Sequence, residues 1–347
     1  MLRIKVTKQL TEYTGGFFNI MCHNNSIQTT KKSSVLIDKT KSGKIRPWRE
    51  KKISNVGYWE LLHILEFKKA ERVKDCAEIL EYKMDIETSE INLYRVWFCK
   101  SRLCPMCNWR RAMKHGIQSK KVVAEVIKQK PTARWLFLTL TVKNVYDGEE
   151  LNKSLSDMAK GFNRMMKYKK VVKNLIGFMR ATEVTINEID NSYNQHMHVL
   201  LCVESTYFSN TENYVTQKQW IKFWRKAMKL DYDPSVKISI VRPKNKYKTD
   251  VESAIAETAK YPVKDTDFMT DDEQKNLKRL SDLEEGLYRK RLISYGGLLK
   301  EIHKKLNLDD VEEGDLIHAD DEQEQADQEG FSIIAMWNWE RQNYFIK

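Results

Sequence analysis

The sequence predicts an α+β fold in which helices pack on an antiparallel β-sheet, and three observations lead to it. Between residues 131 and 268, apolar β-rich runs alternate with amphipathic helical patterns in the order β-α-β-β-α-β. This order is typical of the ferredoxin-like, split βαβ arrangement. The preceding segment has cysteines at metal-binding spacing, and the following segment is charged with a helical pattern. We therefore expect an N-terminal zinc-binding module and a helical C-terminal extension around the sheet.

The strands are predicted from period-two alternation and from β-branched content. The run WLFLTLTV places leucines on one side of a strand and the hydroxyls of Thr139 and Thr141 on the other. Paired hydroxyls of this kind are common in any strand. Two further strands are joined by a turn-rich segment, and a short fourth strand closes the pattern. The predicted ranges are 135–142, 176–187, 196–203 and 236–241.

The helices are predicted where apolar residues recur every three or four positions. One follows the Asp-Gly pair at 147–148 and has a Met and aromatic stripe, which is more often core than a cofactor site. A second is expected over 216–229, and a third, capped by Asp250, over 250–261. A short helix over 59–71 and a long basic helix over 108–130, ended by Pro131, precede the sheet.

The charge of the chain is strongly asymmetric. Its 347 residues include 60 Lys and Arg against 48 Asp and Glu, a formal net charge of +12. Residues 309–329 carry eleven acids and no Lys or Arg, which leaves +23 on the rest. This charge indicates a polyanionic partner, nucleic acid before membrane, because no apolar run approaches the roughly 18 residues that span a bilayer. The first ten residues lack the apolar region of a signal peptide, so a cytoplasmic protein is expected.

Composition divides the chain into four consecutive segments. They are a basic arm over 1–70, a cysteine module with a basic helix over 71–130, the sheet domain over 131–268, and a helical region over 269–347 that contains an acidic linker over 309–329. The arm is expected to be extended around 31–52, with a solvated linker as an equal alternative. The acidic segment is interpreted as a solubilising linker in preference to a mimic of DNA. The aromatic residues 331–347 are expected to fold back onto the body.

The cysteines indicate a structural zinc site. Three of them follow the pattern Cys-x4-Cys-x2-Cys, in which a tight turn lets two thiolates reach one ion. Tetrahedral zinc needs a fourth ligand, for which His115 and the Cys22–His23 pair are the weaker alternatives. A redox or buried-thiol cluster without metal is the simpler alternative. The expected ligands are Cys76, Cys99, Cys104 and Cys107.

Basic side chains follow the first cysteine of this run. They would surround the metal-binding turn, where they could contact DNA phosphates. The candidates are Arg102, Arg110, Arg111 and Lys114.

Two histidines and an acid form a candidate metal site on the predicted sheet. The strand period of two places His196 and His198 on one face, where both imidazoles can hold a divalent ion. Glu183 on the neighbouring strand is the expected third ligand, because an acid within a β-rich run needs a partner. Taken alone, a His-x-His pair on a strand is more often a pair of ordinary histidines.

A carboxylate and a phenol share one face of the helix that follows the last predicted strand. Glu257 and Tyr261 are spaced i, i+4, and Lys260 and Lys264 flank them. A phenol can attack a phosphodiester, but its pKa near 10 means that a metal and cations must favour the phenolate. The alternative is a surface helix with a half-buried tyrosine. Together with the histidines, these residues indicate cleavage of a DNA strand through a tyrosine.

These motifs resemble those of the HUH-type rolling-circle replication initiators, or Rep proteins, of small Gram-positive plasmids. The similar segments are FLTLTV, NQHMHVLLCV, AETAKYPVKDTDF, the cysteine run FCKSRLCPMCNWRRAMK and the arm GKIRPWREKK, all between residues 40 and 270. The resemblance implies the HUH endonuclease fold, with Tyr261 as the nucleophile and Mn2+ or Mg2+ bound by His196 and His198. It also implies that Glu257 activates water at termination, in place of a second tyrosine.

The implied activity begins at the double-strand origin of a plasmid. Nicking leaves a 5′-phosphotyrosine link and a 3′-OH primer, and a second cleavage and joining step releases circular single-stranded DNA. The resemblance further implies a host helicase and DNA polymerase as partners, and a homodimer on the origin.

Other classes of protein remain as alternatives at this point. Relaxases usually have the tyrosine before the histidines, and HUH transposases are usually much shorter. A non-enzymatic zinc-containing DNA-binding regulator would explain the charge and the cysteines but would leave the histidines, Glu257 and Tyr261 as coincidence.

Overall fold

The computed structural model describes residues 34–40, 42–85, 91–241, 250–258, 263–319 and 330–347. Contacts divide the chain into two compact units, one from residues 1–49, 78–96 and 325–347 and a larger one from 50–77 and 97–324. The smaller unit combines three stretches that are far apart in sequence. The four consecutive segments expected from composition therefore do not coincide with these units.

The larger unit contains a five-stranded antiparallel sheet with the strand order β6-β3-β5-β4-β7. From β3 to β6, the long elements follow the predicted order β-α-β-β-α-β, and the α+β class is confirmed. The strand ends differ from the predicted ones by at most three residues. The bounds are β3 Arg134–Thr141, β4 Leu175–Ile186, β5 Tyr193–Val203, β6 Val236–Ile240 and β7 Ile293–Gly297.

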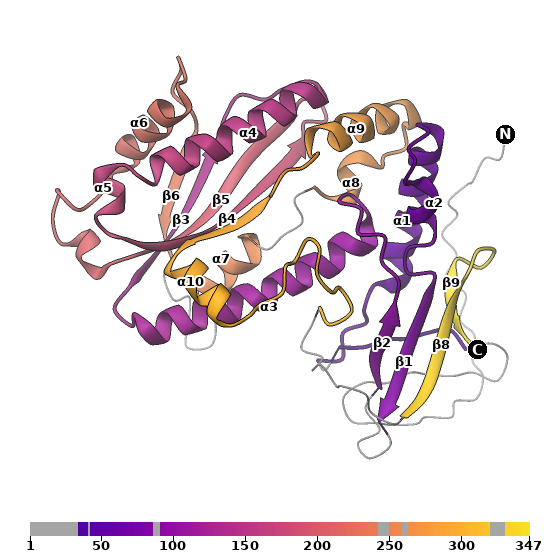
Figure 1. Ribbon diagram of the computed structural model, residues 1–347. Helices are drawn as coiled ribbons and strands as arrows, with labels where there is room; N and C mark the ends of the chain where they lie inside the picture. The colour runs from indigo at the N-terminus through magenta and orange to yellow at the C-terminus, as the bar shows by residue number, and fades with distance from the viewer. Residues whose placement is uncertain (1–33, 41, 86–90, 242–249, 259–262, 320–329) are drawn as a thin grey trace. The chain divides into compact units, whose positions relative to one another are not determined.

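Helices cover both faces of this sheet (Figure 1). On one face, α4 (Gly148–Met165) and α6 (Gln217–Met228) pack against β3 and β5 residues such as Leu138, Val199 and Leu201. On the other face, α3 (Pro105–Gln129), α7 (Asp250–Thr258) and α10 (Leu298–Lys305) pack against Met179, Leu200 and other residues of opposite parity. Because side chains point alternately to the two faces of a strand, each central strand contributes residues to both apolar cores.

Local sequence explains where α4 and α6 begin and end. Asp147 caps α4 by accepting a hydrogen bond from the Glu150 amide at 2.8 Å. Thr216 and Gln219 form a reciprocal capping box at the start of α6. Lys229 ends α6 in the left-handed conformation, at φ 58°. Both helices were predicted from periodicity, and their bounds agree with the predicted ones within a few residues.

The arm and the short helix expected near the N-terminus need correction. Helix α1 spans Trp48–Ile64 and α2 spans Ala70–Lys74, so the expected helix over 59–71 was placed too late. The buried stripe of α1 contains Lys52, whose ammonium donates to the carbonyls of Lys74 and Cys76 at 2.7 Å each. A lysine on the buried side interrupts the apolar periodicity, which is why the helix start looked like part of a basic arm.

The smaller unit contains a second antiparallel sheet of order β2-β1-β8-β9. It was not predicted as a sheet, although residues 331–347 were expected to fold back. Near it, the Asp38 carboxylate accepts hydrogen bonds from Arg46 at 2.6 Å and Trp48 at 2.7 Å. These three side chains are buried, so this part of the predicted extended arm is folded. The strands are β1 Ile79–Asp85, β2 Ile91–Val96, β8 Gly330–Asn338 and β9 Asn343–Ile346.

The C-terminal extension of the larger unit is only partly helical. Helix α9 (Glu273–Gly286) and α10 were expected as helix, but β7 between them was not. A Cβ at Gly296 would lie 2.2 Å from the Phe178 ring, so glycine permits the close pairing of β7 with β4. Short helices complete the unit, and none of the helices in the described ranges is long and apolar enough to cross a membrane. They are α5 Lys169–Val172, η1 Ser205–Phe208 and α8 Asp265–Phe268.

Candidate active site and cysteine cluster

The structure brings together the two histidines and the acid predicted as metal ligands. In the sheet register, His196 lies opposite Glu183, and His198 lies opposite Ala181. The Oε2 atom of Glu183 is 3.4 Å from His196 Nε2 and 3.2 Å from His198 Nε2. All three side chains are only 12–13% exposed. Adjacent strands therefore gather three ligand atoms at one point, as the strand pattern predicted.

The orientation of both imidazoles is set by bonds on their far sides. His196 Nδ1 lies 3.2 Å from the Asn194 carbonyl, and His198 Nδ1 lies 3.3 Å from the Thr139 hydroxyl. The His198 ring also stacks on Phe137 at 5.5 Å. In each ring the Nε2 atom is thereby directed towards Glu183. Partners of this kind fix the ring and the tautomer of metal-binding histidines.

Sequence reasoning treated Thr139 as an ordinary strand residue. The missing information was the register of the sheet, which places Thr139 opposite His198 and Thr141 opposite His196. The Thr141 hydroxyl instead donates to the Ser235 carbonyl at 2.9 Å. The two threonines thus have different roles that the sequence pattern cannot distinguish.

The charge and spacing of the site suit a divalent ion. Burial by itself would raise the pKa of Glu183, but hydrogen bonds and charge from His196 and His198 outweigh it and lower the pKa to about 2. The carboxylate is therefore ionised at neutral pH. Two neighbouring ligands of an octahedral ion held at about 2.1 Å lie about 3.0 Å apart, close to the separations here. The three residues fit such an ion.

The tyrosine end of the predicted site lies mostly outside the described residues. Tyr261 and Lys260 fall in the range 259–262, and of Glu257 only its backbone position in α7 is described. The i, i+4 pairing of Glu257 and Tyr261 stays a prediction. Lys264 is exposed, and its amide donates to the Asp267 carboxylate at 3.3 Å where α8 begins.

Helix α7 packs on the sheet face that carries the histidines. Its residues Ala254 and Ile255 share a core with Met179 and Leu200, which have the same parity as Glu183 and His198. Thr258, the last residue of α7, is buried, and its hydroxyl lies 4.0 Å from the Met179 sulfur. The chain therefore leaves α7 towards residue 261 from the face of the sheet that holds the candidate metal site.

Four cysteines form a second, fully buried cluster. The Sγ atom of Cys107 lies 3.6 Å from those of Cys76 and Cys99, and Cys104 Sγ lies 3.7 Å from Cys76 Sγ. Ala77 and Lys100, which follow two of these cysteines, have positive φ angles of 51° and 56°. These left-handed residues turn the chain so that both thiols point inward.

The cluster fits zinc and excludes the alternative ligands among the described residues. Four sulfurs bound at about 2.3 Å around a tetrahedral ion lie about 3.8 Å apart, near the observed separations. Burial raises the pKa of a thiol, but hydrogen bonds from Cys107, Cys76 and Cys99 outweigh it and hold the pKa of Cys104 well below its usual value. His115 bonds Ser119 instead, at 2.8 Å, while Cys22 and His23 lie outside the described residues. Zinc itself stays a prediction.

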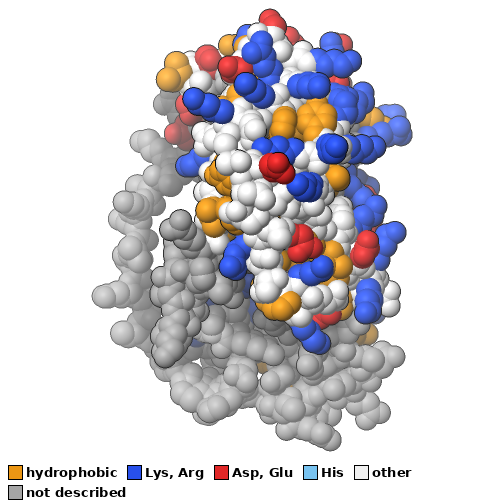
Figure 2. Space-filling model, turned by 90° about the vertical axis from the view of Figure 1, so that its left-hand side faces the viewer, with side chains coloured by type: hydrophobic (Ala, Val, Ile, Leu, Met, Phe, Trp, Pro, Cys, Tyr) orange, Lys and Arg blue, Asp and Glu red, His pale blue; other side chains and the backbone are white. Residues whose placement is uncertain are grey.

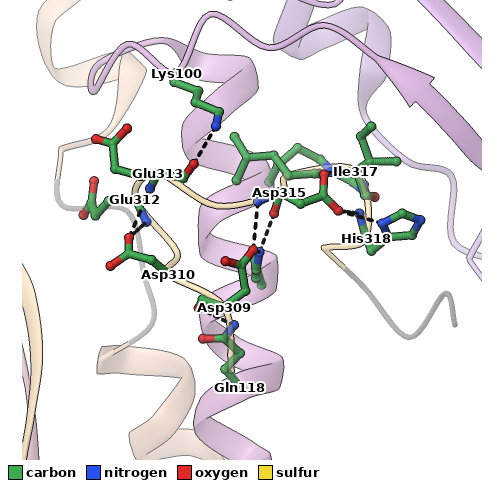
Figure 3. Close-up of polar contacts among 12 residues, drawn as sticks. Lys100, Gln118, Asp309, Asp310, Glu312, Glu313, Asp315, Ile317 and His318 are labelled. Atoms are coloured by element: carbon green, nitrogen blue, oxygen red, sulfur yellow. Dashed lines mark hydrogen bonds and ion pairs between the residues drawn. The ribbon is translucent and has the colours of Figure 1, made fainter. Parts of the chain in front are cut away.

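The cations predicted to contact DNA near this cluster are occupied by another part of the chain. Residues Asp309–His318, here called the acidic strap, lie along α3 (Figure 3). Arg110 donates to the carbonyls of Leu316 and Ile317. The Lys114 ammonium donates to the Asp309 carboxylate and to the Asp315 carbonyl, at 2.5 Å in both cases. Arg110 is fully buried.

Two further cations of the predicted set face the strap as well. Arg111 donates to the Glu312 carbonyl at 3.1 Å and is also buried, and Arg102 lies 3.7 Å from the Glu312 carboxylate. In this arrangement, none of the four is free for a phosphate. The solubilising linker expected over 309–329 is wrong for the strap, because the backbone carbonyls and acids of the strap satisfy buried cations of α3. Residues 320–329 lie outside the described ranges.

Comparison with known proteins shows the family. The sequence profile described as "Replication protein" matches residues 90–345. The chain belongs to the replication-protein family. A "Replication protein" of Staphylococcus aureus is 85% identical over 235 residues, 68% of this chain and 100% of that relative. A "Protein rep" of Lactiplantibacillus plantarum is 50% identical over 317 residues, 90% of this chain and 99% of that relative. No solved structure matches.

Membership of the replication-protein family confirms the part of the resemblance that identified the chain as a plasmid replication protein. The matched range includes three cysteines of the cluster, both histidines and Glu183. These cysteines are Cys99, Cys104 and Cys107. The range begins after Cys76, so the match by itself does not include the whole cysteine cluster.

Proposed function

We propose that the chain is a plasmid replication initiator of the HUH type, which nicks one strand of its origin through Tyr261. Family membership supports the role in replication. The strand order β6-β3-β5-β4, with helices after β3 and β5, has the arrangement of a ferredoxin-like sheet, and β7 adds an edge strand. This is the fold that the resemblance to HUH initiators implies.

The observation that carries the proposal is the convergence of Glu183, His196 and His198 on the face shared with α7. A bound Mn2+ or Mg2+ would neutralise the scissile phosphate and hold it in place. The residues around the site hold the ligands in position. Thr139 and the Asn194 carbonyl orient the imidazoles, and the ionised Glu183 supplies negative charge for the cation.

The length of chain after Thr258 is compatible with Tyr261 as the nucleophile at this site. Thr258 contacts Met179, which lies four residues before Glu183 on β4, about 13 Å away at 3.3 Å per residue. Three residues of chain, from Thr258 to Tyr261, span at most about 11 Å, and the tyrosine side chain adds its own length. The sheet therefore sets an anchor from which the phenol can approach a phosphate held beside the histidines.

The nicking step is an in-line transfer of the phosphoryl group. The Tyr261 phenolate forms a bond to phosphorus, and the bond to the 3′ oxygen breaks. That oxygen takes up a proton and leaves as the 3′-OH primer, while the 5′ phosphate stays on the tyrosine. Lys260 and Lys264 are proposed to favour the phenolate through their positive charge. At termination, Glu257 is proposed to accept a proton from an attacking water.

The cysteine cluster is proposed to hold zinc in a structural role. Its sulfurs are buried, so no ligand position is open to substrate. Further proposals follow from the family resemblance. They are plasmid origin DNA as substrate, a host helicase and DNA polymerase as partners, and a homodimer on the origin.

The proposal is tested with a labelled single-stranded oligonucleotide carrying the nick site of the plasmid's own origin. With Mn2+, the wild-type protein should form a covalent protein–DNA adduct that resists denaturation. Tyr261→Phe should form none. The matched control is Tyr288→Phe, because Tyr288 is 61% exposed and lies far along the chain from the site. Equal adduct formation by wild type and Tyr261→Phe would show that this tyrosine is not the nucleophile.

A further inference from the structure

A second basic surface lies on α5 and α6, away from the cysteine cluster. Residues 217–230 contain five Lys or Arg and no acid, and residues 159–182 contain seven and no acid. Figure 2 shows Lys and Arg side chains gathered on the side of the molecule where these helices lie in Figure 1. Six exposed lysines of this surface, none with a carboxylate partner among the described residues, are here called the basic patch. They are Lys167, Lys169, Lys173, Lys218, Lys222 and Lys229.

The fold of α6 forces its lysines into one row. Trp220 and Trp224 are buried against the sheet, so the opposite side of the helix faces solvent. Lys218 and Lys222 lie one turn apart on that side, and Lys229 follows at the C-terminal end of the helix. At 1.5 Å per residue, the row is about 16 Å long. Along that length a DNA duplex presents about five phosphates on each strand.

Contacts between the helices join the lysines of α5 to this row. Arg164, close to the end of α4, donates to the Ala227 carbonyl at 2.8 Å. Lys170 in α5 donates to the Gln219 side chain at 3.1 Å. The basic patch is therefore one continuous surface built from two neighbouring helices.

We infer that the basic patch binds the phosphate backbone of double-stranded DNA. The inference deepens the proposed function and rests on it. The patch lies over the sheet face opposite the histidines, so a duplex on the patch would leave the face with the candidate metal site open to a separated strand. Surfaces for single strands instead offer free aromatic rings for base stacking. The Tyr168 and Phe223 rings beside the patch pack edge to face with each other, 5.6 Å apart.

Burial distinguishes this patch from the three cations of α3 that were predicted to contact DNA. Arg110, Arg111 and Lys114 are buried and bonded to the acidic strap, whereas the lysines of the patch are exposed. Exposed cations can release counterions from DNA without first breaking contacts within the protein. Charge complementarity to a duplex is thus available on α5 and α6, whereas Arg110, Arg111 and Lys114 of α3 already bond the acidic strap.

The test compares the full-length wild type with a triple variant, Lys218→Ala, Lys222→Ala and Lys229→Ala. Binding to a labelled origin duplex is measured by fluorescence anisotropy over a range of salt concentrations. Loss of three phosphate contacts should weaken duplex binding by about 50-fold and lower the salt slope by about three. The matched control changes Lys300, Lys304 and Lys305 of α10 to alanine, three exposed lysines on a helix of the opposite sheet face. It should retain wild-type affinity.

The outcomes separate this inference from the proposed function. Nicking of the single-stranded oligonucleotide should be unchanged in the triple variant, which also verifies its folding. Wild-type duplex affinity and salt slope in that variant would overturn the patch as a duplex site while leaving Tyr261 chemistry intact. Equal weakening for duplex and single strand would overturn the assignment to double-stranded DNA. An absence of nicking by the wild type would instead count against the proposed function, whatever the duplex affinities show.

Discussion

The cysteine cluster and the histidine site both gather ligands at one point, but they differ in access and in donor atoms. The four cysteines are at most 2% exposed, and all of their donors are sulfur. The ligands at the sheet are 12–13% exposed and combine two nitrogens with one carboxylate. A closed site of four thiolates stabilises a fold, whereas three ligands with open positions can admit a substrate. The difference predicts a structural role for one site and a catalytic role for the other.

The strongest way to test this contrast is to remove two sulfurs from the closed site. Replacing Cys104 and Cys107 by serine should lower zinc from about one ion per chain to near zero and abolish cooperative thermal unfolding, because metal binding at such sites supplies much of the folding free energy. Elemental analysis and thermal unfolding measure both effects. Cys202→Ser is the control, since Cys202 is buried in the sheet outside the cluster. Full zinc content in the double variant would contradict the assignment.

Removing one ligand of the open site should affect activity much more than folding. We expect Glu183→Gln to reduce Mn2+-dependent nicking at least about 100-fold, because the site loses its only carboxylate among the three ligands. Its zinc content should stay near that of the wild type, and its thermal unfolding should stay cooperative. Glu204→Gln is the matched control, because Glu204 follows β5 and is 41% exposed beside Lys130. Nicking at the wild-type rate by Glu183→Gln would remove Glu183 from the site.

The ionised state of Glu183 predicts a pH dependence of stability. Its pKa in the folded protein is about 2, below the value of about 4.3 in an unfolded chain. Its contribution is therefore complete above about pH 5 and is lost as the pH falls towards 2, up to about 3 kcal/mol in all. Urea unfolding without added Mn2+ or Mg2+ measures it as the difference between wild type and Glu183→Gln. A difference that is the same at pH 6 and pH 3 would contradict this.

The smallest expected effect comes from the bond behind His198. Thr139→Val keeps the shape of the side chain but removes the hydroxyl that lies 3.3 Å from His198 Nδ1. Loss of such a partner should weaken Mn2+ binding about 10-fold, measured by titration of free Mn2+ with electron paramagnetic resonance. Thr141→Val is the control, because its hydroxyl bonds the Ser235 carbonyl instead. If both variants bind Mn2+ equally well, the Thr139 hydroxyl does not orient the ligand.

The parts of the fold predicted correctly depend on short-range patterns. Strands β3 to β6 and helices α4 and α6 have clear periodicity and local caps, such as the box at Thr216. The missed strand β1 pairs with its sequence neighbour β2, but it joins β8 only through residues 79–85 and the distant residues 330–338. Nothing local in either stretch identifies the other as its partner. Strand β7 depends in the same way on β4, through the close approach at Gly296.

The sequence by itself determined the chemistry available to this protein. The spacing of the cysteines and the alternation of His196 and His198 follow from geometry within a single strand or turn. Tertiary structure decided which residues meet, because strand register and chain return depend on packing between distant segments. It places Glu183 beside the two histidines and Cys76 beside the other three thiols. It also buried Arg110, Arg111 and Lys114 against the acidic strap and left the lysines of the basic patch exposed, a distinction that composition cannot make.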